Sequence, residues 1–579
     1  MIKAFKHLSW FFKENWYKYL ICGVALLIVS VFPVIPGKIL GMAIDELAMG
    51  TLTQSKFIQY IVGLMIFPIT VYLVNIFYHY SVNKLGQNLS FKLRERYIIH
   101  LFEMDAELFE EYTKGDLIAR VTNDLQSLTI LATSFLQNIV YYIALITSAV
   151  FMMIVISPLL TLCSISFMPF AIFLLNYLRK KKRAYYKQHH EIYANMTESV
   201  LESIESVKVV RAYGVEDIDF KKTKAAIDAD VMSWWKILKF EAVFNPLFEL
   251  TYAIAYFIAI GLGCYLVVNS VITPGALVSF LVYVGMLYGP LIGLSTILIN
   301  ISNIVIADNR FYEIMDRKPK VVNVTHPQPV MEFKELKFND VSFKYPFDDF
   351  DVIKNINLTI SKGETIGIVG PTGAGKSTLI RQLLREFNST SGTVEINGVN
   401  IKDLVIEDVR SLVGYVPQNN ILFRRPIEEN ILIGDPAATD ARLENALKVA
   451  DFEKDLKMLP EGIKTQVSEL GNSLSGGQRQ RLSIARALVK DPEILILDDS
   501  LSAVDALTEA NIIDKLRETR SGKTNIIVAH RFSAIAKADK IVVMEEGKIS
   551  CIGSHNELIN YDNWYKHQYL KQIKGEIYD

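Results

Sequence analysis

The chain has 579 residues, enough for more than one domain. Hydrophobic residues make up 51% of it and charged residues 21%, and the formal net charge of −1 gives no support for a nucleic-acid partner. The four cysteines are scattered singly, so they predict neither a disulfide framework nor a metal cluster. The mean hydropathy of +0.24 averages over two parts of different composition. Long apolar runs fill residues 1–305, and the remainder is typical of a soluble α/β protein.

The first half contains apolar stretches long enough to cross a bilayer, which takes roughly 20 residues. We place six of them, near residues 17–43, 57–82, 132–156, 158–178, 247–269 and 277–300. The segment from Met1 to Lys18 is amphipathic and predicts an interfacial helix that leads into the first span. We therefore predict an all-α, six-helix transmembrane domain over 1–305, a linker over 306–333 and an α/β domain over 334–579.

Lysine and arginine are distributed unevenly between the two sides of these spans. They are frequent at the N-terminus, after the second span and at 179–183, whereas the loops 44–56 and 270–276 are poor in them. Cytoplasmic loops carry the excess of cations, so both termini should be cytoplasmic in a multi-pass protein of the plasma membrane. The long loops 83–131 and 179–245 keep helical periodicity, which predicts helices that continue past the bilayer.

One acidic residue, Glu249, falls inside the fifth apolar stretch, just after Pro246. An ionisable residue in a span is a functional hypothesis by default. Glu249 could meet a cationic substrate in a central cavity, pair with a neighbouring helix, or see water near the interface. These alternatives stay open at the level of the sequence.

The second half contains a phosphate-binding pattern in its expected context. A short apolar strand, 365–369, runs into residues 370–377, which match G-x-x-x-x-G-K-[ST], and a helix follows from Thr378. Such glycines let backbone N–H groups point at phosphate oxygens, Lys376 reaches the β- and γ-phosphates, and the Ser377 hydroxyl binds Mg²⁺. The predicted nucleotide contacts of this loop are Gly370, Thr372, Gly373, Gly375, Lys376, Ser377 and Thr378.

Further candidates lie at strand ends and at one helix start. Asp498 and Asp499 end the apolar strand 494–497, where a carboxylate can organise Mg²⁺. His530 follows the strand 524–528 and could contact the γ-phosphate, and Gln418 could contact Mg²⁺ or a water. Tyr345 could stack on an adenine. The start of a helix at Ser475, Gly476, Gly477 and Gln478 could hold an anion on its backbone N–H groups.

Taken together, these residues resemble the ATP-binding cassette (ABC) family. The order of the matching motifs is Tyr345, the Walker A loop 370–377, the Q-loop Gln418, the signature 474–478, the Walker B Asp498, the D-loop 502–505 and the switch His530. Six spans and one cassette on a chain are the layout of a half-size exporter of the bacterial multidrug type, so the resemblance implies the type IV exporter fold. Residues 113–124 and 211–216 look like its coupling-helix regions, and Thr465, Val467, Ser468, Glu469 and Gly471 resemble its X-loop.

The resemblance implies ATP and Mg²⁺ as cofactors, with Ser377, Gln418 and Asp498 around the metal and Asp499, Gln418 and His530 in hydrolysis. In the family, two cassettes close head to tail on two ATP molecules, so a second half-transporter chain is implied. Ser475 to Gln478 would serve the nucleotide that this partner holds. ATP hydrolysis would then drive export of small hydrophobic or amphipathic compounds from the membrane by alternating access.

The chain departs from the family pattern after the Walker B aspartate. The family usually has a glutamate there, which orients the attacking water, and this chain has Asp499. Aspartate is shorter by about 1 Å, and a misplacement of that size can cost about 10²-fold in rate. The segment resembles the degenerate-site half of heterodimeric multidrug exporters, so we expect slow hydrolysis at this site and a partner with glutamate. Backbone shifts that compensate for the shorter side chain are the alternative.

Other functions are also compatible with the sequence. A lipid flippase would be a homodimer with lipid-dependent ATPase activity. An ATP-gated channel or regulatory subunit would tolerate one slow site, but it would not move a substrate against a gradient.

Overall fold

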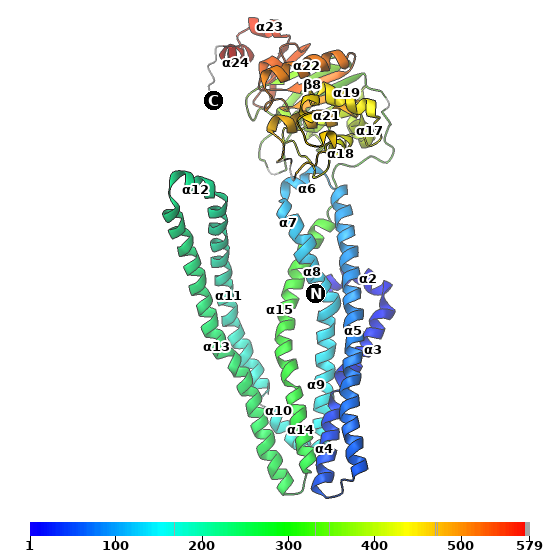
Figure 1. Cartoon of the computed structure of the whole chain (residues 1–579), viewed down its shortest axis with the longest axis vertical. Coiled ribbons are helices and arrows are strands. Elements are labelled where there is room, and N and C mark those ends of the chain that lie inside the picture. The colour runs from blue at the N-terminus through cyan, green and yellow to red at the C-terminus, as the bar shows by residue number, and fades with distance from the viewer. Residues whose placement is uncertain (167, 331, 347, 469–470, 472, 574–579) are drawn as a thin grey trace. The chain divides into compact units, whose positions relative to one another are not determined.

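The computed structural model describes residues 1–166, 168–330, 332–346, 348–468, 471 and 473–573, with side chains left out at 136, 168–183, 244–245, 247–248, 251, 291–292, 294–296 and 298–299. The chain divides into two compact units. The first holds residues 1–99 and 115–316, and the second holds residues 100–114 and 317–579. Each unit is labelled by element in Figure 1.

All the secondary structure described for the first unit is helical. Its elements are α1 (Ile2–His7), α2 (Ser9–Glu14), α3 (Trp16–Val31), α4 (Val34–Ala48), α5 (Gln54–Glu103, shared with the second unit), α7 (Lys114–Ala119), α8 (Leu125–Ile130), α9 (Leu136–Ile156), α10 (Pro158–Ile165), α11 (Met168–Glu205), α12 (Val207–Tyr213), α13 (Glu216–Val268), α14 (Pro274–Met286) and α15 (Tyr288–Met315). Two π-helical turns, η1 (Arg120–Asp124) and η2 (Leu131–Phe135), flank α8.

Within the part of the chain that the structure describes, three helices are long and apolar enough to cross a membrane. They are Trp16–Ala48, Gln54–Glu103 and Lys114–Ile156, and two shorter apolar helices cover Tyr252–Val268 and Pro274–Pro290. The predicted fourth span, 158–178, continues into residues whose side chains lie outside the described ones. The expected helical membrane domain is confirmed, and the count of six spans stays a prediction.

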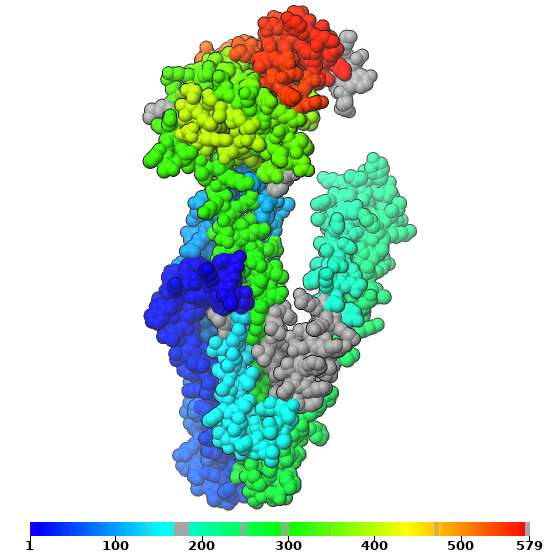
Figure 2. All heavy atoms as spheres, turned by 180° about the vertical axis from the view of Figure 1, so that it is seen from behind, coloured from blue at the N-terminus to red at the C-terminus, as the bar shows by residue number. Residues whose placement is uncertain are grey.

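The helices α5 and α13 are too long to lie within a bilayer. They contain 50 and 53 residues, which at 1.5 Å per residue give each a length of about 75–80 Å, against roughly 30 Å of hydrocarbon. α13 packs along α11, and α12 closes their far end, so the pair forms an arm of the unit that diverges from α5, α9 and α15 (Figure 1). Figure 2 shows this arm from behind. The predicted continuation of the loops as helices is therefore confirmed.

The N-terminal segment differs from the single interfacial helix that we expected. It forms two short helices, α1 and α2, with a break at Leu8. Leu8 and Phe11 are fully buried, and His7 Nδ1 lies 2.9 Å from Asp308 Oδ1 on α15. The imidazole also stacks on the Tyr312 ring, with centroids 3.7 Å apart. The segment thus contacts α15 through His7.

The second unit contains two sheets. The strands are β1 (Glu335–Phe343), β2 (Ile353–Ser361), β3 (Thr365–Val369), β4 (Ser391–Ile396), β5 (Val399–Asn400), β6 (Val413–Val416), β7 (Ile494–Asp498), β8 (Thr524–Val528), β9 (Lys540–Glu545) and β10 (Lys548–Gly553). The antiparallel sheet has the order β2-β1-β4-β5, and the other has the order β10-β9-β3-β8-β7-β6. In the larger sheet all neighbours pair in parallel except β10 and β9.

Helices pack around the larger sheet. They are α16 (Lys376–Leu383), α17 (Ile406–Leu412), α18 (Ile427–Leu432), α19 (Asp440–Val449), α20 (Glu453–Leu456), α21 (Gly476–Leu488), α22 (Ala506–Thr519), α23 (His555–Asn560) and α24 (Trp564–Ile573), and α6 (Ala106–Glu111) also belongs to this unit. Every residue of β7 and of β8 is buried, as expected for parallel strands covered on both faces. The predicted α/β domain after a helical domain is confirmed.

Candidate nucleotide-binding site

The predicted site residues converge because four parallel strands end at one edge of the larger sheet. β3 leads into the loop 370–377, β7 ends in Asp498, β8 leads towards His530, and β6 leads towards Gln418. Since β3, β8, β7 and β6 are consecutive neighbours with the same direction, their carboxyl ends lie together. Ligands of such sheets bind in the crevice outside these carboxyl ends.

The loop 370–377 depends on glycine for its conformation. Gly373 and Gly375 have φ values of 83° and 90°, in the left-handed region that other residues rarely adopt. A Cβ atom at Gly370 would also lie 2.0 Å from the carbonyl oxygen of Met544. The loop therefore keeps a tight turn between β3 and the first turn of α16, where backbone N–H groups have no helical partner.

Lys376 is buried at the start of α16, and its side chain turns back over the loop. Its Nζ donates to the carbonyl oxygens of Gly370, at 2.8 Å, and Pro371, at 3.0 Å. Burial lowers the pKa of the ammonium, and the charges of Asp499 and Asp498 oppose this shift. A buried cation whose hydrogen bonds go to neutral carbonyls gains from an incoming anion, so the geometry fits a phosphate group.

Asp498 lies beside Ser377, as the motifs predicted. Its Oδ1 accepts a hydrogen bond from Ser377 Oγ at 3.1 Å, and its Oδ2 accepts one from the Tyr415 hydroxyl at 3.4 Å. The residue is 2% exposed, and burial is the main reason that the pKa of its carboxyl is raised. A hard divalent cation prefers such hydroxyl and carboxylate oxygens, so these two side chains fit Mg²⁺.

The backbone of Asp499 is fixed by the neighbouring strand. Its N–H donates to the carbonyl oxygen of Val528, the last residue of β8, at 2.9 Å. Its φ of 48° places it in the left-handed region, which aspartate tolerates better than most residues. Its carbonyl accepts from Ser502 Oγ at 2.9 Å, so the start of the D-loop is tied to it.

Tyr345 lies near the same loop, held by rings and by its hydroxyl group. The ring packs edge-on against Phe343, with centroids 4.9 Å apart, and against Phe387. The hydroxyl lies 3.1 Å from Thr378 Oγ1 and accepts a hydrogen bond from Arg381 Nη1 at 3.2 Å. The tyrosine is half-buried, so part of the ring remains available for a ligand.

Gln418 and His530 are exposed beyond the ends of β6 and β8. The backbone carbonyl of His530 accepts from Gln572 Nε2 at 2.8 Å. Among the residues that the structure describes, neither of these two side chains forms a hydrogen bond with the loop 370–377. The fold thus brings both residues to the edge of the sheet where the loop 370–377 lies, but no hydrogen bond links their side chains to that loop among the described residues.

The signature residues form a separate cluster at the start of α21. Ser475 and Gln478 cap this helix reciprocally, through hydrogen bonds of 3.2 and 2.9 Å. Gln478 also donates to Asp455, at 3.1 Å, and a Cβ atom at Gly476 would lie 3.6 Å from that of Ala503. Within the described ranges, the hydrogen bonds of Ser475 and Gln478 do not reach the loop 370–377. Glu469 of the predicted X-loop lies outside the described residues.

Two contributors to the site were not anticipated from the sequence. Tyr415 on β6 supports Asp498, and Arg381 on α16 supports Tyr345. A period-two pattern in β6 could have pointed to Tyr415. The motifs do not include Arg381, whose other partners are Glu386, at 2.7 Å, and Glu110, which is 271 residues away in the sequence.

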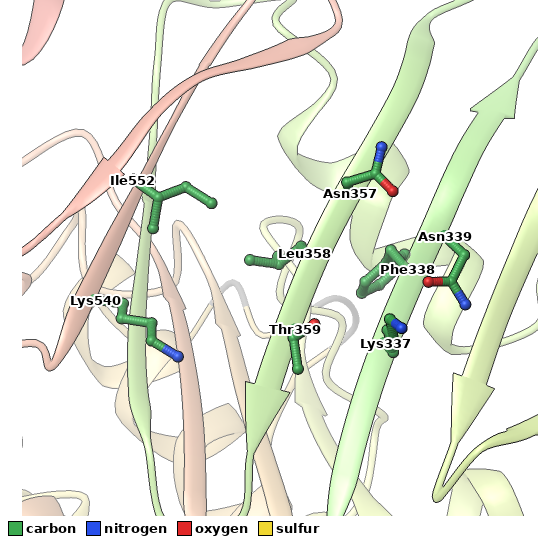
Figure 3. A pocket seen from close by; sticks show the side chains of 8 residues that line it. All are labelled: Lys337, Phe338, Asn339, Asn357, Leu358, Thr359, Lys540 and Ile552. Carbon is green, nitrogen blue, oxygen red and sulfur yellow. The ribbon is translucent and has the colours of Figure 1, made fainter.

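A cavity of about 250 Å³ lies elsewhere in this unit, between β1 and β2 and the strands β9 and β10. Figure 3 shows its lining, with Lys337 and Thr359 on one side and Lys540 on the other. It includes none of the predicted nucleotide contacts, so we do not assign it to the nucleotide.

Comparison with known families and proteins agrees with both units. Residues 19–291 match the family described as "ABC transporter transmembrane region", and residues 353–502 match "ABC transporter". The chain is 39% identical to the "Probable multidrug resistance ABC transporter ATP-binding/permease protein YheI" of Bacillus subtilis (strain 168), covering 99% of this chain and 98% of that protein. It is 31% identical to the "Multidrug resistance-like ATP-binding protein MdlA" of Escherichia coli (strain K12), covering 100% and 98%.

Among solved structures, the chain resembles a bacterial Atm1-family ABC exporter with ATP bound. The TM-score is 0.80 at 24% identity, and the match covers 96% of this chain and 99% of that one. This likeness shows the exporter fold. The motif geometry, the two family matches and the full-length relatives therefore lead to one conclusion: the chain belongs to the ABC transporter family, as a multi-pass membrane protein whose ATPase activity is coupled to transport.

Proposed function

We propose that the protein exports hydrophobic or amphipathic compounds across the bacterial plasma membrane, driven by ATP. The observation that carries this proposal is that one chain holds both a membrane-crossing helical unit and the nucleotide site at the edge of the larger sheet. The printed names of the relatives from Bacillus subtilis and Escherichia coli refer to multidrug resistance. Both termini are cytoplasmic in this proposal, and six spans lie within residues 1–305.

In the proposed site, the loop 370–377 cradles the phosphates of ATP and Lys376 neutralises them. Ser377 and Asp498 hold Mg²⁺ together with Gln418, and Tyr345 stacks on the adenine. The support is the 3.1 Å contact between Ser377 and Asp498 and the burial of Lys376 and Asp498. His530 and Asp499 would face the γ-phosphate and the attacking water from the ends of β8 and β7.

In this proposal a second half-transporter chain completes the transporter and its two ATP sites. The hydrogen bonds of the signature residues Ser475 and Gln478 cap α21 and, among the described residues, do not involve the loop 370–377. In the proposed complex the signature binds the nucleotide that the partner chain holds. The proposal of a different partner, with glutamate after its Walker B aspartate, rests on Asp499. The hydrogen bond from Asp499 N–H to Val528 fixes the backbone from which the shorter side chain starts. This opposes the alternative in which a backbone shift restores the reach of a glutamate.

The test is purification of the tagged full-length chain from its native host, with mass identification of the protein that co-purifies. The proposal expects a second half-transporter in a stable complex that hydrolyses ATP. A stable, ATPase-active homodimer would contradict the heterodimer proposal.

In the same complex, with the partner's own catalytic carboxylate changed to the amide, Asp499→Glu should raise the remaining ATPase activity. Asp514→Glu is a matched control, because Asp514 is exposed and pairs only with Lys537 among the described residues. If Asp499→Asn stops hydrolysis while the partner is intact, this chain's site is the working one and the proposal is wrong.

A further inference from the structure

A cavity of about 350 Å³ opens between α3 and α5 in the first unit. Its lining comes from one face of each helix. Lys18, Ile21 and Cys22 follow the helical spacing on α3, and the α5 residues run from Phe77 to Asn88 with the same spacing. Both helices belong to candidate membrane spans.

The cavity has a basic end and an apolar end. On α3 the lysine at 18 comes first and Ile21 and Cys22 lie a turn further into the span. On α5, which runs the other way, Lys84 lies seven residues, or about 10 Å, from Phe77. The two helices thus place both ammonium groups at the end nearest the N-terminus and the apolar side chains deeper. Ser81, between the two ends, and Asn88, at the basic end, add hydrogen-bonding groups.

Among the described residues neither lysine forms an ion pair, although the charge of Lys18, after the hydrogen bond from Lys92, contributes to the lowered pKa of Glu14. Lys18 Nζ donates to the amide oxygen of Asn15 at 2.9 Å, and Lys84 Nζ lies 5.7 Å from the Tyr80 ring centroid. The next cation along α5 behaves differently, because Lys92 forms an ion pair with Glu14 at 2.5 Å. The cavity therefore carries two positive charges that a ligand can neutralise.

Aromatic side chains mark this end of the cavity as the membrane interface. Trp16 is 64% exposed, and Tyr80 at the mouth is 67% exposed. Tryptophan and tyrosine are enriched where hydrocarbon meets the headgroups. Basic pockets between membrane helices near the headgroups are suited to anionic lipids.

We propose that this cavity binds a membrane phospholipid with an anionic headgroup, in the leaflet nearest the N-terminus. Lys18 and Lys84 bind the headgroup phosphate, Ser81 and Asn88 bind its polar atoms, and an acyl chain lies along Ile21 and Phe77. The proposal needs α3 and α5 in a membrane, and it is independent of what the transporter exports.

The test is native mass spectrometry of the full-length protein, with its co-purifying partner, titrated with phosphatidylglycerol and, separately, with phosphatidylcholine. We expect tighter binding of phosphatidylglycerol, and a loss of at least roughly tenfold in its affinity in Lys18→Gln/Lys84→Gln. Lys18→Arg/Lys84→Arg keeps the charge and should keep the binding. Lys3→Gln/Lys6→Gln is the matched control, since both lysines are exposed on α1 outside the cavity.

Equal loss in the Lys3/Lys6 control would mean general surface attraction and would overturn the proposal. So would unchanged binding in Lys18→Gln/Lys84→Gln. Displacement of the lipid by inorganic phosphate at the same concentration would show an anion site without lipid recognition, which also contradicts the proposal. Thermal unfolding of each variant in lipid-free detergent separates lost binding from lost folding. If only binding is lost, Lys18→Gln/Lys84→Gln and Lys18→Arg/Lys84→Arg should have the same melting temperature.

Discussion

The Arg381 guanidinium on α16 donates to Glu110 Oε1 on α6 at 2.8 Å, and Glu110 comes from the segment that links α5 to α7. The same guanidinium donates to the Tyr345 hydroxyl and lies 4.9 Å from the Phe387 ring centroid. Residues 100–114 belong to the nucleotide-binding unit by their contacts. A side chain beside the predicted adenine-stacking tyrosine is thus tied to a segment between two helices of the membrane unit.

Loss of the Arg381–Glu110 ion pair should weaken the coupling between ATP hydrolysis and transport, with only a small loss in the free energy of unfolding. Both partners are partly exposed, so the pair is worth about 0.2–1 kcal/mol, and a double-mutant cycle of Arg381→Gln and Glu110→Gln should give a coupling energy in that range. We expect Glu110→Gln to lower substrate-stimulated ATPase activity with little change in basal activity. Glu111→Gln is the control, because Glu111 pairs with Arg317 instead. Equal effects of the two variants would contradict the assignment.

Lys376→Ala should abolish ATP binding at this chain's own site. The reason is that the ammonium lies directly over this loop, with its Nζ bonded to the carbonyl oxygens of Gly370 and Pro371. Binding of a fluorescent ATP analogue by the full-length protein measures the loss. Lys337→Ala, in the separate cavity of this unit, should bind the analogue as the parent does. Normal binding by Lys376→Ala would show that the loop 370–377 is not the phosphate site.

Magnesium dependence should follow the contact between Ser377 and Asp498. Removing the hydroxyl in Ser377→Ala leaves only the Asp498 carboxylate of this pair for the cation. We expect the Mg²⁺ concentration needed for half-maximal ATPase activity to rise several-fold, and chelation of Mg²⁺ to stop hydrolysis in the parent. An unchanged Mg²⁺ requirement in Ser377→Ala would contradict the proposed metal site.

The signature serine can be separated from its structural role by a matched variant. Ser475 caps α21 together with Gln478, and Ser554 caps α23 together with Glu557 in the same way. Loss of either cap costs about 1 kcal/mol. Ser475→Ala should lower the ATPase activity of the two-chain complex without weakening ATP binding at Lys376, whereas Ser554→Ala should lower only the melting temperature. Equal losses of ATPase activity in both would leave Ser475 with a structural role alone.

Local patterns predicted the parts of the fold that local chemistry decides. The strand, loop and helix around 370–377 follow from glycine positions and apolar runs, and Asp498 follows from its place at the end of a buried strand. The membrane helices follow from hydropathy. The sheet order that brings Gln418 and His530 to the same edge was not predicted, because strand pairing is not encoded in any one segment.

Contacts between distant segments were beyond the sequence. The carboxylate of Asp45 accepts from Thr273 Oγ1 at 2.6 Å and from Gly275 N–H at 2.7 Å, capping α14. A Cβ atom at Gly275 would lie 1.9 Å from the carbonyl oxygen of Gly41, so these helices meet through glycine. Glu249 is exposed on α13, a position that leaves its role open to the substrate hypothesis.

Transport by the purified complex in proteoliposomes tests the central claim most directly. The measured quantity is the accumulation of a fluorescent amphipathic cation inside vesicles whose nucleotide-binding units face outward. The account predicts accumulation above the outside concentration with ATP and Mg²⁺, and none with a non-hydrolysable ATP analogue. If the dye only reaches the outside concentration, or enters equally with ATP and with the analogue, the protein is a nucleotide-gated pathway and not an exporter.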